Sequence, residues 1–273
     1  MYKNIYIVST SQSSNLTTKL ESRYAAKLRR ANELTKISAI TALHVLSLAE
    51  KSGLSFNKEK TGLFVSTITG PINDNFGFLD SIQANGEGFG SPTLFSHSVT
   101  SAVAGYLTMI LECTGPVLST TSFAWPFIEA LQSAWISLQT SDLEYAIVVY
   151  VQEQVKMLQE AHELLCPKKG DNKEFQITET VAWLLTCKDH VNQNFPSLIN
   201  INVELYNHDP DDLICGKCFM TFSDGKWLES NRSQHAKNLT FWLDALKNNP
   251  NQKKIWQGKS SLGQTSVTID FHE

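Results

Sequence analysis

Residues 91–124 read SPTLFSHSVTSAVAGYLTMILECTGPVLSTTSFA, and this stretch decides the fold. Within it, residues 99–111 combine small and apolar side chains in the way typical of a buried helix. Gly115-Pro116 ends that helix, and residues 117–122 form a β-branched and hydroxyl-rich run that predicts a strand. The proline at the start of residues 126–138 suits the first turn of a second helix. The predicted order is helix, strand, sharp elbow, helix.

The same alternation extends to both sides of this stretch. Residues 28–51 carry apolar positions at helical spacing, and residues 61–69 are rich in Val, Ile, Phe and Thr. Residues 144–151 are apolar on both faces, as expected of a central strand that helices cover. A helix is predicted over residues 152–165 and a strand over residues 175–187. Strands that alternate with helices predict a mainly parallel α/β sheet.

The pattern changes near residue 190, where we place a domain boundary. The remaining chain holds less regular structure and is too short for a second unit of the same kind. Its predicted elements are strands over residues 199–206, 218–222 and 266–271 and one helix over residues 239–247. We therefore expect an N-terminal domain of residues 1–190 and a shortened, divergent C-terminal α+β portion of residues 191–273.

Composition excludes several classes of function. Of the residues, 42% are hydrophobic, and 23 basic against 27 acidic residues give a net charge of −4, so nucleic acid and anionic membrane surfaces are not expected partners. No apolar window is long enough for a membrane span, and the first residues lack the features of a signal peptide. Five cysteines at irregular spacings fit a reducing compartment. These features predict a soluble, cytoplasmic protein.

Residues 91–124 resemble the β-ketoacyl synthases without a gap as far as the active-site elbow of that family. Arg29-Arg30 with the following helix, residues 61–70 and residues 144–153 resemble its neighbouring elements. The motifs that carry the resemblance are Ser91-Pro92, Val103-Ala104-Gly105, Leu107-Thr108 and Gly115-Pro116. The resemblance implies a thiolase-like α/β half, in which helices cover a five-stranded mixed, mostly parallel sheet.

The resemblance also implies that the chemistry of the family is absent. A ketosynthase forms an acyl thioester on a cysteine at the elbow, where the helix N-terminus stabilises the thiolate. Ala124 occupies that position here, and Phe123, Trp125 and Phe127 are bulky where the family keeps room for an acyl chain. A shifted register would offer a hydroxyl between Ser119 and Ser122 instead, but the sequence identifies no adjacent base.

The family's second-half histidines have no counterpart by motif. Neither a His-Gly-Thr-Gly-Thr run nor a Gly-His turn is present, and His208, His235 and His272 lack matching neighbours, so surface or structural roles are expected. His97 is expected to serve in structural hydrogen bonding. The resemblance therefore predicts a chain that is not an enzyme and holds no cofactor.

A second small motif, Cys215-Gly-Lys-Cys218, is a lone C-x-x-C. With His208 or His235 it offers four ligands for zinc, but no second pair at finger spacing accompanies it. Two partly buried thiols are the expected reading, and Cys215 and Cys218 stay weak metal candidates.

Ketosynthases dimerise through the strand before the elbow, and in heterodimeric systems one subunit, the chain-length factor, has lost the cysteine. The resemblance thus implies a heterodimer or a higher-order assembly with an active ketosynthase, and an acyl carrier protein that binds through this complex. An isolated half would also expose apolar helix surface, which marks interfaces. The expected interface residues are Val117, Leu118, Ser119, Thr120, Thr121 and Ser122.

In such heterodimers the silent subunit closes the end of its partner's acyl tunnel. Residues 72–82 match the tunnel-end helix of the family, which makes Asn75, Phe76 and Leu79 candidates for gating, with ordinary core packing as the alternative. The expected function is that of a chain-length-factor-like subunit in polyketide, aryl polyene or fatty acid elongation. The alternatives are a standalone serine- or threonine-dependent acyltransferase or hydrolase, and a non-enzymatic assembly scaffold.

Overall fold

A computed structural model describes residues 2–15, 22–153, 179–188, 195–205, 217–221, 227–231, 234–246, 254–260 and 262–271. The strands are β1 (Tyr6–Gln12), β2 (Thr61–Thr67), β3 (Val117–Thr121), β4 (Tyr145–Gln152), β5 (Glu179–Thr186), β6 (Ser197–Leu205), β7 (Lys217–Thr221), β8 (Trp227–Asn231), β9 (Lys254–Ser260) and β10 (Gly263–Asp270). The helices are α1 (Ser22–Lys27), α2 (Glu33–Lys51), α3 (Ile72–Asn85), α4 (Pro92–His97), α5 (Ser101–Leu111), α6 (Pro126–Thr140) and α8 (His235–Leu246), with short 3-10 turns η1 (Ser13–Asn15) and η2 (Lys58–Lys60).

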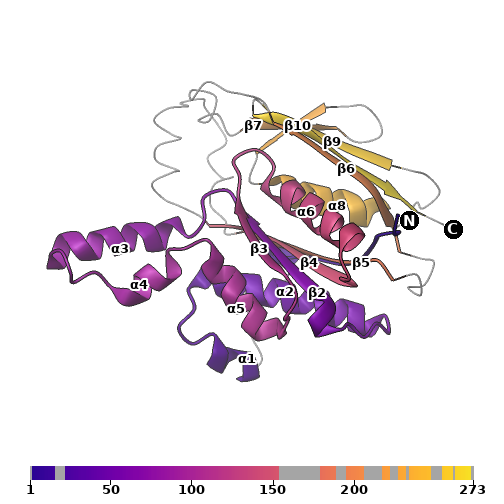
Figure 1. Cartoon of the computed structure of the whole chain (residues 1–273). Coiled ribbons are helices and arrows are strands. Elements are labelled where there is room, and N and C mark those ends of the chain that lie inside the picture. The colour runs from indigo at the N-terminus through magenta and orange to yellow at the C-terminus, as the bar shows by residue number, and fades with distance from the viewer. Residues whose placement is uncertain are drawn as a thin grey trace.

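All ten of these strands form one sheet, in the order β3-β2-β4-β5-β1-β6-β10-β9-β7-β8. β2 pairs in parallel with β3 and with β4, whereas the other pairings between described strands are antiparallel. The join between the two ends of the chain is narrow, because β1 meets β6 only through the pair Tyr6 and Ser197. The sheet bends at this join (Figure 1).

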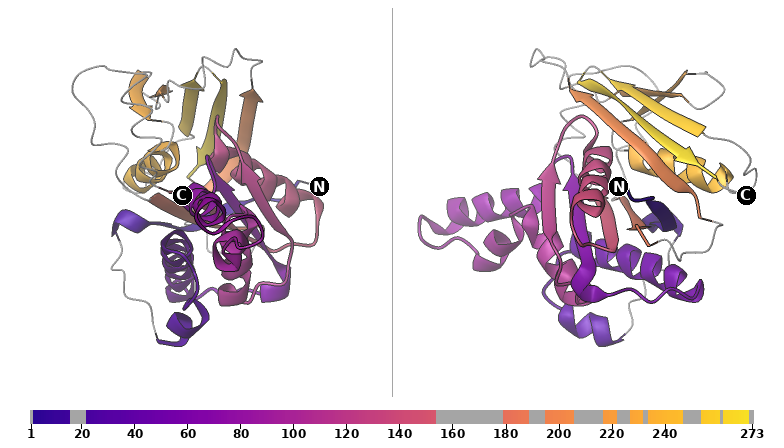
Figure 2. Two further views of the ribbon diagram at one scale, coloured as in Figure 1. Left: turned by 90° about the vertical axis from the view of Figure 1, so that its left-hand side faces the viewer. Right: turned by 45° about the vertical axis from the view of Figure 1, so that its right-hand side comes forward.

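The bent sheet encloses two helices. Helices α6 and α8 lie between its two halves, and α2 and α5 cover the opposite face of the half formed by β3, β2, β4, β5 and β1 (Figures 1 and 2). The order of layers is therefore helix, sheet, helix, sheet. Among the described residues, no helix is both long and apolar enough to cross a membrane.

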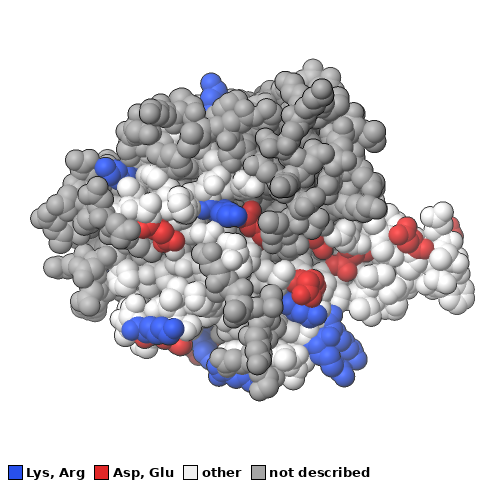
Figure 3. All heavy atoms as spheres, turned by 180° about the vertical axis from the view of Figure 1, so that it is seen from behind, with Lys and Arg blue, Asp and Glu red and all other residues white. Residues whose placement is uncertain are grey.

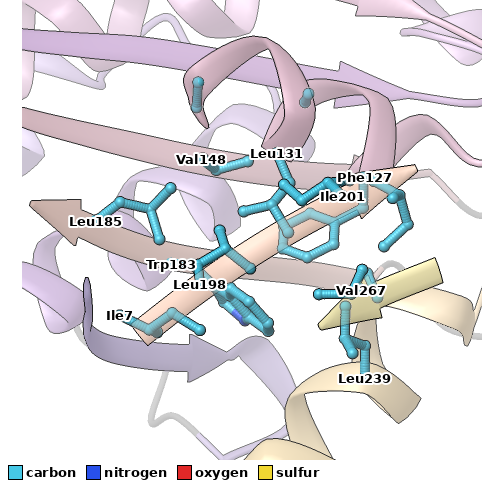
Figure 4. Packing of buried hydrophobic residues seen from close by; sticks show 14 of the residues in the cluster. Ile7, Phe127, Leu131, Val148, Trp183, Leu185, Leu198, Ile201, Leu239 and Val267 are labelled. Atoms are coloured by element: carbon cyan, nitrogen blue, oxygen red, sulfur yellow. The ribbon is translucent and has the colours of Figure 1, made fainter. Parts of the chain in front are cut away.

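Two hydrophobic cores follow from these layers. The larger core surrounds α6 and α8, and it joins Ile7, Phe127 and Trp183 to Leu239 and Val267 from the C-terminal portion (Figure 4). The second core lies between the sheet and helices α2 and α5. The larger core includes residues from both sides of the boundary that the sequence predicts near residue 190.

The mixed α/β class is confirmed, but two details of the predicted sheet are wrong. The first five strands of the order match the predicted five-stranded half, yet the sheet continues through the C-terminal strands to ten. Parallel pairing is also limited to β2 and its two neighbours. β4 and β5 are apolar on both faces because helices lie on both sides of them, and that burial is the same for either strand direction.

The predicted exposure of apolar helix surface on a half-fold is wrong in part. The apolar side of α6, including Phe127, Leu131 and Ala134, is completely buried beneath the C-terminal portion. The buried side of α6 therefore does not support the expectation of a partner protein. Exposed apolar side chains lie elsewhere, along β3 and on a projection formed by α3 and α4.

Candidate functional site

The turn before β3 depends on a glycine. A Cβ atom at Gly115 would lie 2.4 Å from the carbonyl oxygen of Thr61, so no other residue fits without moving the backbone. The next carbonyl, that of Pro116, accepts a hydrogen bond of 2.9 Å from the Leu63 N–H. This contact starts the parallel pairing of β2 with β3, and the strand leads directly to the elbow.

The elbow itself comprises residues 122–125, between the end of β3 and the first turn of α6. Ala124 is buried, and so are Trp125 and Phe127, whereas Phe123 is 53% exposed. Within the elbow, Phe123 therefore lies outward and Trp125 inward. That Ala124 stands at the nucleophile position stays a prediction.

Trp125 lies beneath the C-terminal strands. Its indole N–H donates to the carbonyl oxygen of Gly263 over 3.2 Å, and its ring contacts that of Trp256 edge to face, with centroids 5.9 Å apart. Gly258 on β9 makes room for it, since a Cβ there would lie 2.6 Å from Cη2 of Trp125. Three residues of the C-terminal portion, Trp256, Gly258 and Gly263, thus pack closely against Trp125.

His235, the first residue of α8, lies at the N-terminus of α6. The Phe127 N–H donates to Nε2 of His235 over 3.2 Å, which requires the neutral ring with its proton on Nδ1. The imidazole is fully buried and contacts the rings of Trp125 and Tyr150. His235 is thus a buried histidine with a hydrogen-bond partner, one of the two roles expected for it, and its ring lies against the elbow although no sequence motif indicated that contact.

Ser122 has an acid partner that the sequence did not reveal. Its hydroxyl donates to Oε1 of Glu129 over 2.5 Å and accepts from the Ala124 N–H over 3.3 Å. The spacing of seven residues spans a strand end and a helix start, so no single periodicity predicts this contact. The statement that no base adjoins the hydroxyl residues is wrong for Ser122.

Strand β3 forms one edge of the sheet, because its pairing partner among the described strands is β2. The Ser122 N–H points to β2, where it donates to Thr67, and backbone direction alternates along a strand. The backbone groups of Val117, Ser119 and Thr121 therefore point away from the sheet. The Val117 and Leu118 side chains are 45% and 38% exposed.

The three gating candidates lie together on α3. Asn75 and Phe76 are partly exposed and Leu79 is 57% exposed, and α3 has no buried residue. None of the three is fully buried, and their gating role stays a prediction. Residues 72–97, which form α3 and α4, project from the body as an arm (Figure 1).

The remaining candidates lie apart from the elbow. His97 is buried and its Nε2 lies 3.2 Å from the Tyr106 hydroxyl, which confirms structural hydrogen bonding. Cys215 and His208 fall outside the described residues, and Cys218 lies in β7, so a zinc site stays a prediction. In the described part of the chain, no three His, Cys, Asp or Glu side chains converge as metal ligands would.

Surface charges are mixed in sign on the described part of the face opposite to that of Figure 1 (Figure 3). Among the described residues, Glu144 lies 3.2 Å from Lys60 and 2.5 Å from Lys188, and its hydrogen bond to Lys188 holds the pKa of its carboxyl below the usual value. The described part of the face in Figure 3 shows charges of both signs and so does not favour a polyanion.

Comparison with known proteins agrees with the elbow and the sheet. The sequence matches the β-ketoacyl synthase N-terminal domain family over residues 10–197. No curated protein matches the chain. A structure of a type II polyketide synthase acyl-carrier protein in complex with its ketosynthase superposes with a TM-score of 0.72 and 10% identity, over 99% of this chain and 100% of that chain.

Two further structures resemble the chain. The ishigamide ketosynthase/chain length factor has a TM-score of 0.59 and 13% identity, over 77% of this chain and 68% of that chain. A ketosynthase in complex with its chain length factor from Xenorhabdus doucetiae has a TM-score of 0.57 and 13% identity, over 98% of this chain and 99% of that chain. These likenesses show a shared fold, and the family match covers well over half of the sequence. The chain therefore belongs to the β-ketoacyl synthase N-terminal domain family.

Proposed function

We propose that the chain is a catalytically silent, chain-length-factor-like subunit that pairs with an active ketosynthase. The observation that carries the proposal is the elbow, where Ala124 replaces a nucleophile and His235 occupies the helix N-terminus. A thiolate at an elbow needs the N–H groups of the helix N-terminus for its stabilisation. Here the Phe127 N–H is already bound to a buried imidazole.

The space around the elbow supports the same proposal. Trp125 is completely buried and contacts Trp256 and His235, where an acyl chain would need an open channel. Converting this region to a substrate site would require removal of the indole and its hydrogen bond to Gly263. We infer that these residues stabilise the fold and perform no chemistry.

The edge of β3 supports a partner. An unpaired strand edge with exposed apolar residues is a surface that proteins normally cover or pair. Val117 and Leu118 lie on this edge, and the exposed Phe123 follows it directly. We propose that residues 117–122 pair with the equivalent strand of the ketosynthase.

The superposed complexes contain chains of a length similar to that of the proposed subunit. The aligned chains of the structures with the acyl-carrier protein and with the Xenorhabdus doucetiae chain length factor are matched over 100% and 99% of their lengths. Chains of nearly this length therefore occur in ketosynthase assemblies. By this likeness we propose that an acyl carrier protein reaches the complex and that the pathway makes a polyketide, an aryl polyene or a fatty acid.

The test is co-expression with a full-length ketosynthase that contains the cysteine and both histidines, sought first in the neighbouring reading frame. We expect the two to co-purify as a heterodimer on size exclusion. A stable monomer of this chain alongside a separate ketosynthase homodimer would overturn the proposal.

The gating part of the proposal has its own test. Leu79→Ala and Phe76→Ala should lengthen the products of the reconstituted pair, because each removes volume at the proposed end of the acyl tunnel. Product chain length is measured by mass spectrometry. Unchanged products from both variants would remove the gating role while leaving the heterodimer standing.

A serine-dependent acyltransferase is the second candidate, favoured by the 2.5 Å hydrogen bond from Ser122 to Glu129. In that case a p-nitrophenyl ester should acylate Ser122, and Ser122→Ala should abolish the adduct. Absence of any adduct at residue 122 by peptide mass spectrometry would remove this candidate.

A further inference from the structure

The arm of residues 72–97 packs mainly on itself. The rings of Phe78 and Phe95 are 5.3 Å apart, and Gly90 allows close packing, since a Cβ there would lie 2.8 Å from Phe78. The arm joins the body at both ends, through the N-terminus of α3 and through the C-terminus of α4, where the buried His97 lies 3.2 Å from the Tyr106 hydroxyl of α5 (Figure 1). The contacts that hold the N-terminus of α3 therefore contribute to the direction of the arm.

Helix α3 does not cap its own N-terminus. Its N-cap residue is Pro71, which makes no side-chain hydrogen bond. Instead, the Asn73 N–H donates over 3.2 Å to Oε2 of Glu153, which directly follows β4. A carboxylate at a helix N-terminus also interacts favourably with the helix dipole. Burial raises the pKa of the Glu153 carboxyl, and the hydrogen bonds from Asn73 oppose this shift.

Gln152 holds the loop that precedes the helix. Its Oε1 accepts from the Ile68 N–H over 3.2 Å, and its Nε2 donates to the Thr69 hydroxyl over 3.1 Å. A further contact comes from Asn32, whose amide donates to Asp74 over 2.5 Å. Two consecutive residues at the end of a central strand thus fix both the loop and the first turn of α3.

We propose that Gln152 and Glu153 are positioning residues that set the direction of the arm and, through it, the depth available to the partner's acyl chain. The second part rests on the proposed function, and the first does not. A small rotation at the N-terminus of α3 produces a larger displacement farther along the helix. Leu79 lies six residues beyond Asn73, about 9 Å along the helix, so a tilt of about 10° moves it by roughly 1.5 Å.

The test compares Glu153→Ala, which loses the hydrogen bond, with Glu153→Gln, which retains an oxygen acceptor. Glu87→Ala is the matched control, because Glu87 is exposed and lies at the far end of the same arm. Hydrogen exchange of the peptide covering residues 72–85 is measured in the full chain alone, and product length in the reconstituted pair. We expect Glu153→Ala to speed exchange of this peptide several-fold and to broaden the product distribution, whereas Glu153→Gln and Glu87→Ala resemble the unaltered chain.

Two results would overturn the proposal at different steps. Unchanged hydrogen exchange of residues 72–85 in Glu153→Ala would show that the contact between Glu153 and Asn73 does not hold the arm, and this result does not depend on the proposed function. Faster exchange with unchanged products, in a pair whose products Leu79→Ala does change, would separate arm direction from product length. If Leu79→Ala also leaves product length unchanged, the hypothesis that Leu79 limits product length is wrong. Hydrogen exchange in Glu153→Ala still tests whether Glu153 positions the arm.

Discussion

Trp125 and His235 support the proposed lack of catalysis more directly than Ala124 does. Their rings fill the space next to the elbow, and His235 accepts a hydrogen bond from the Phe127 N–H that a thiolate there would use. Both contacts join residues more than a hundred positions apart. The elbow is therefore a junction between the two portions of the chain.

Restoring the thiol should not restore catalysis. In Ala124→Cys, the new side chain would lie beside Trp125 and near a helix N-terminus whose Phe127 N–H is already bonded to His235. We expect no acyl adduct at residue 124 after incubation with an acyl-carrier-protein thioester, as measured by peptide mass spectrometry. Acylation of the introduced thiol would show that the site retains its chemistry.

The contact of Trp125 with Gly258 predicts a large effect of one methyl group. Gly258→Ala should lower the free energy of unfolding by about 1–3 kcal/mol, because the new Cβ would overlap the indole ring. Gly105→Ala on α5 is the control: nothing lies within 4 Å of its Cβ position, so it should stabilise by about 0.5–1 kcal/mol. Equal effects in urea unfolding would contradict the packing described for Trp125.

Glu179 predicts a pH dependence of stability. Burial raises the pKa of its carboxyl from 4.5 to about 7, and the Lys237 ammonium, 3.9 Å away, is too distant for a hydrogen bond. The folded chain therefore binds more protons between these values, and stability falls as pH rises through this window, by up to about 3 kcal/mol. Glu179→Gln should be the more stable protein at pH 8 and nearly equal to the unaltered chain at pH 5.

Urea unfolding at the two pH values measures this difference directly. Glu87→Gln, at an exposed position, serves as the control and should follow the unaltered chain at both. A Glu179→Gln variant with no advantage at pH 8 would show that the carboxyl is solvated after all.

At the scale of elements, local sequence patterns predict the order of helices and strands well. They predict poorly which elements contact one another and in which direction strands pair. The helix-strand-elbow-helix order is confirmed by α5, β3 and α6 because each has its own periodicity and breakers. The direction of β5 was missed because full burial is compatible with either direction. The contact of His235 with Phe127 had no local signal, since it depends on how the sheet bends.

The edge of β3 can be tested one residue at a time. Thr121 is exposed and its backbone N–H points outward, so Thr121→Pro should leave pairing with β2 intact while removing a donor from the free edge. We expect Thr121→Pro, but not Thr121→Ala, to weaken association with the ketosynthase at least tenfold. Similar affinities for both variants, measured by calorimetry, would place the interface elsewhere.

At the scale of the whole molecule, one bent sheet joins the two portions of the chain through a shared core. The C-terminal strands cover α6 and α8 and complete the larger core, and in doing so they bring Gly258, Gly263 and His235 to the elbow. A sequence-based boundary near residue 190 marks a change of pattern, yet the hydrophobic core continues across it. Exposed apolar side chains lie on β3 and the arm, and others, such as Phe241 on α8 and Ile136 on α6, lie on the body.

The proposed function is tested most directly by the elongation rate of the co-expressed ketosynthase, measured with carrier-protein-bound substrate in the presence and absence of this chain. We expect elongation only with both proteins, and loss of all activity when the cysteine of the ketosynthase is replaced while this chain is unaltered. Elongation or acyl transfer by this chain alone would contradict the proposed silent role.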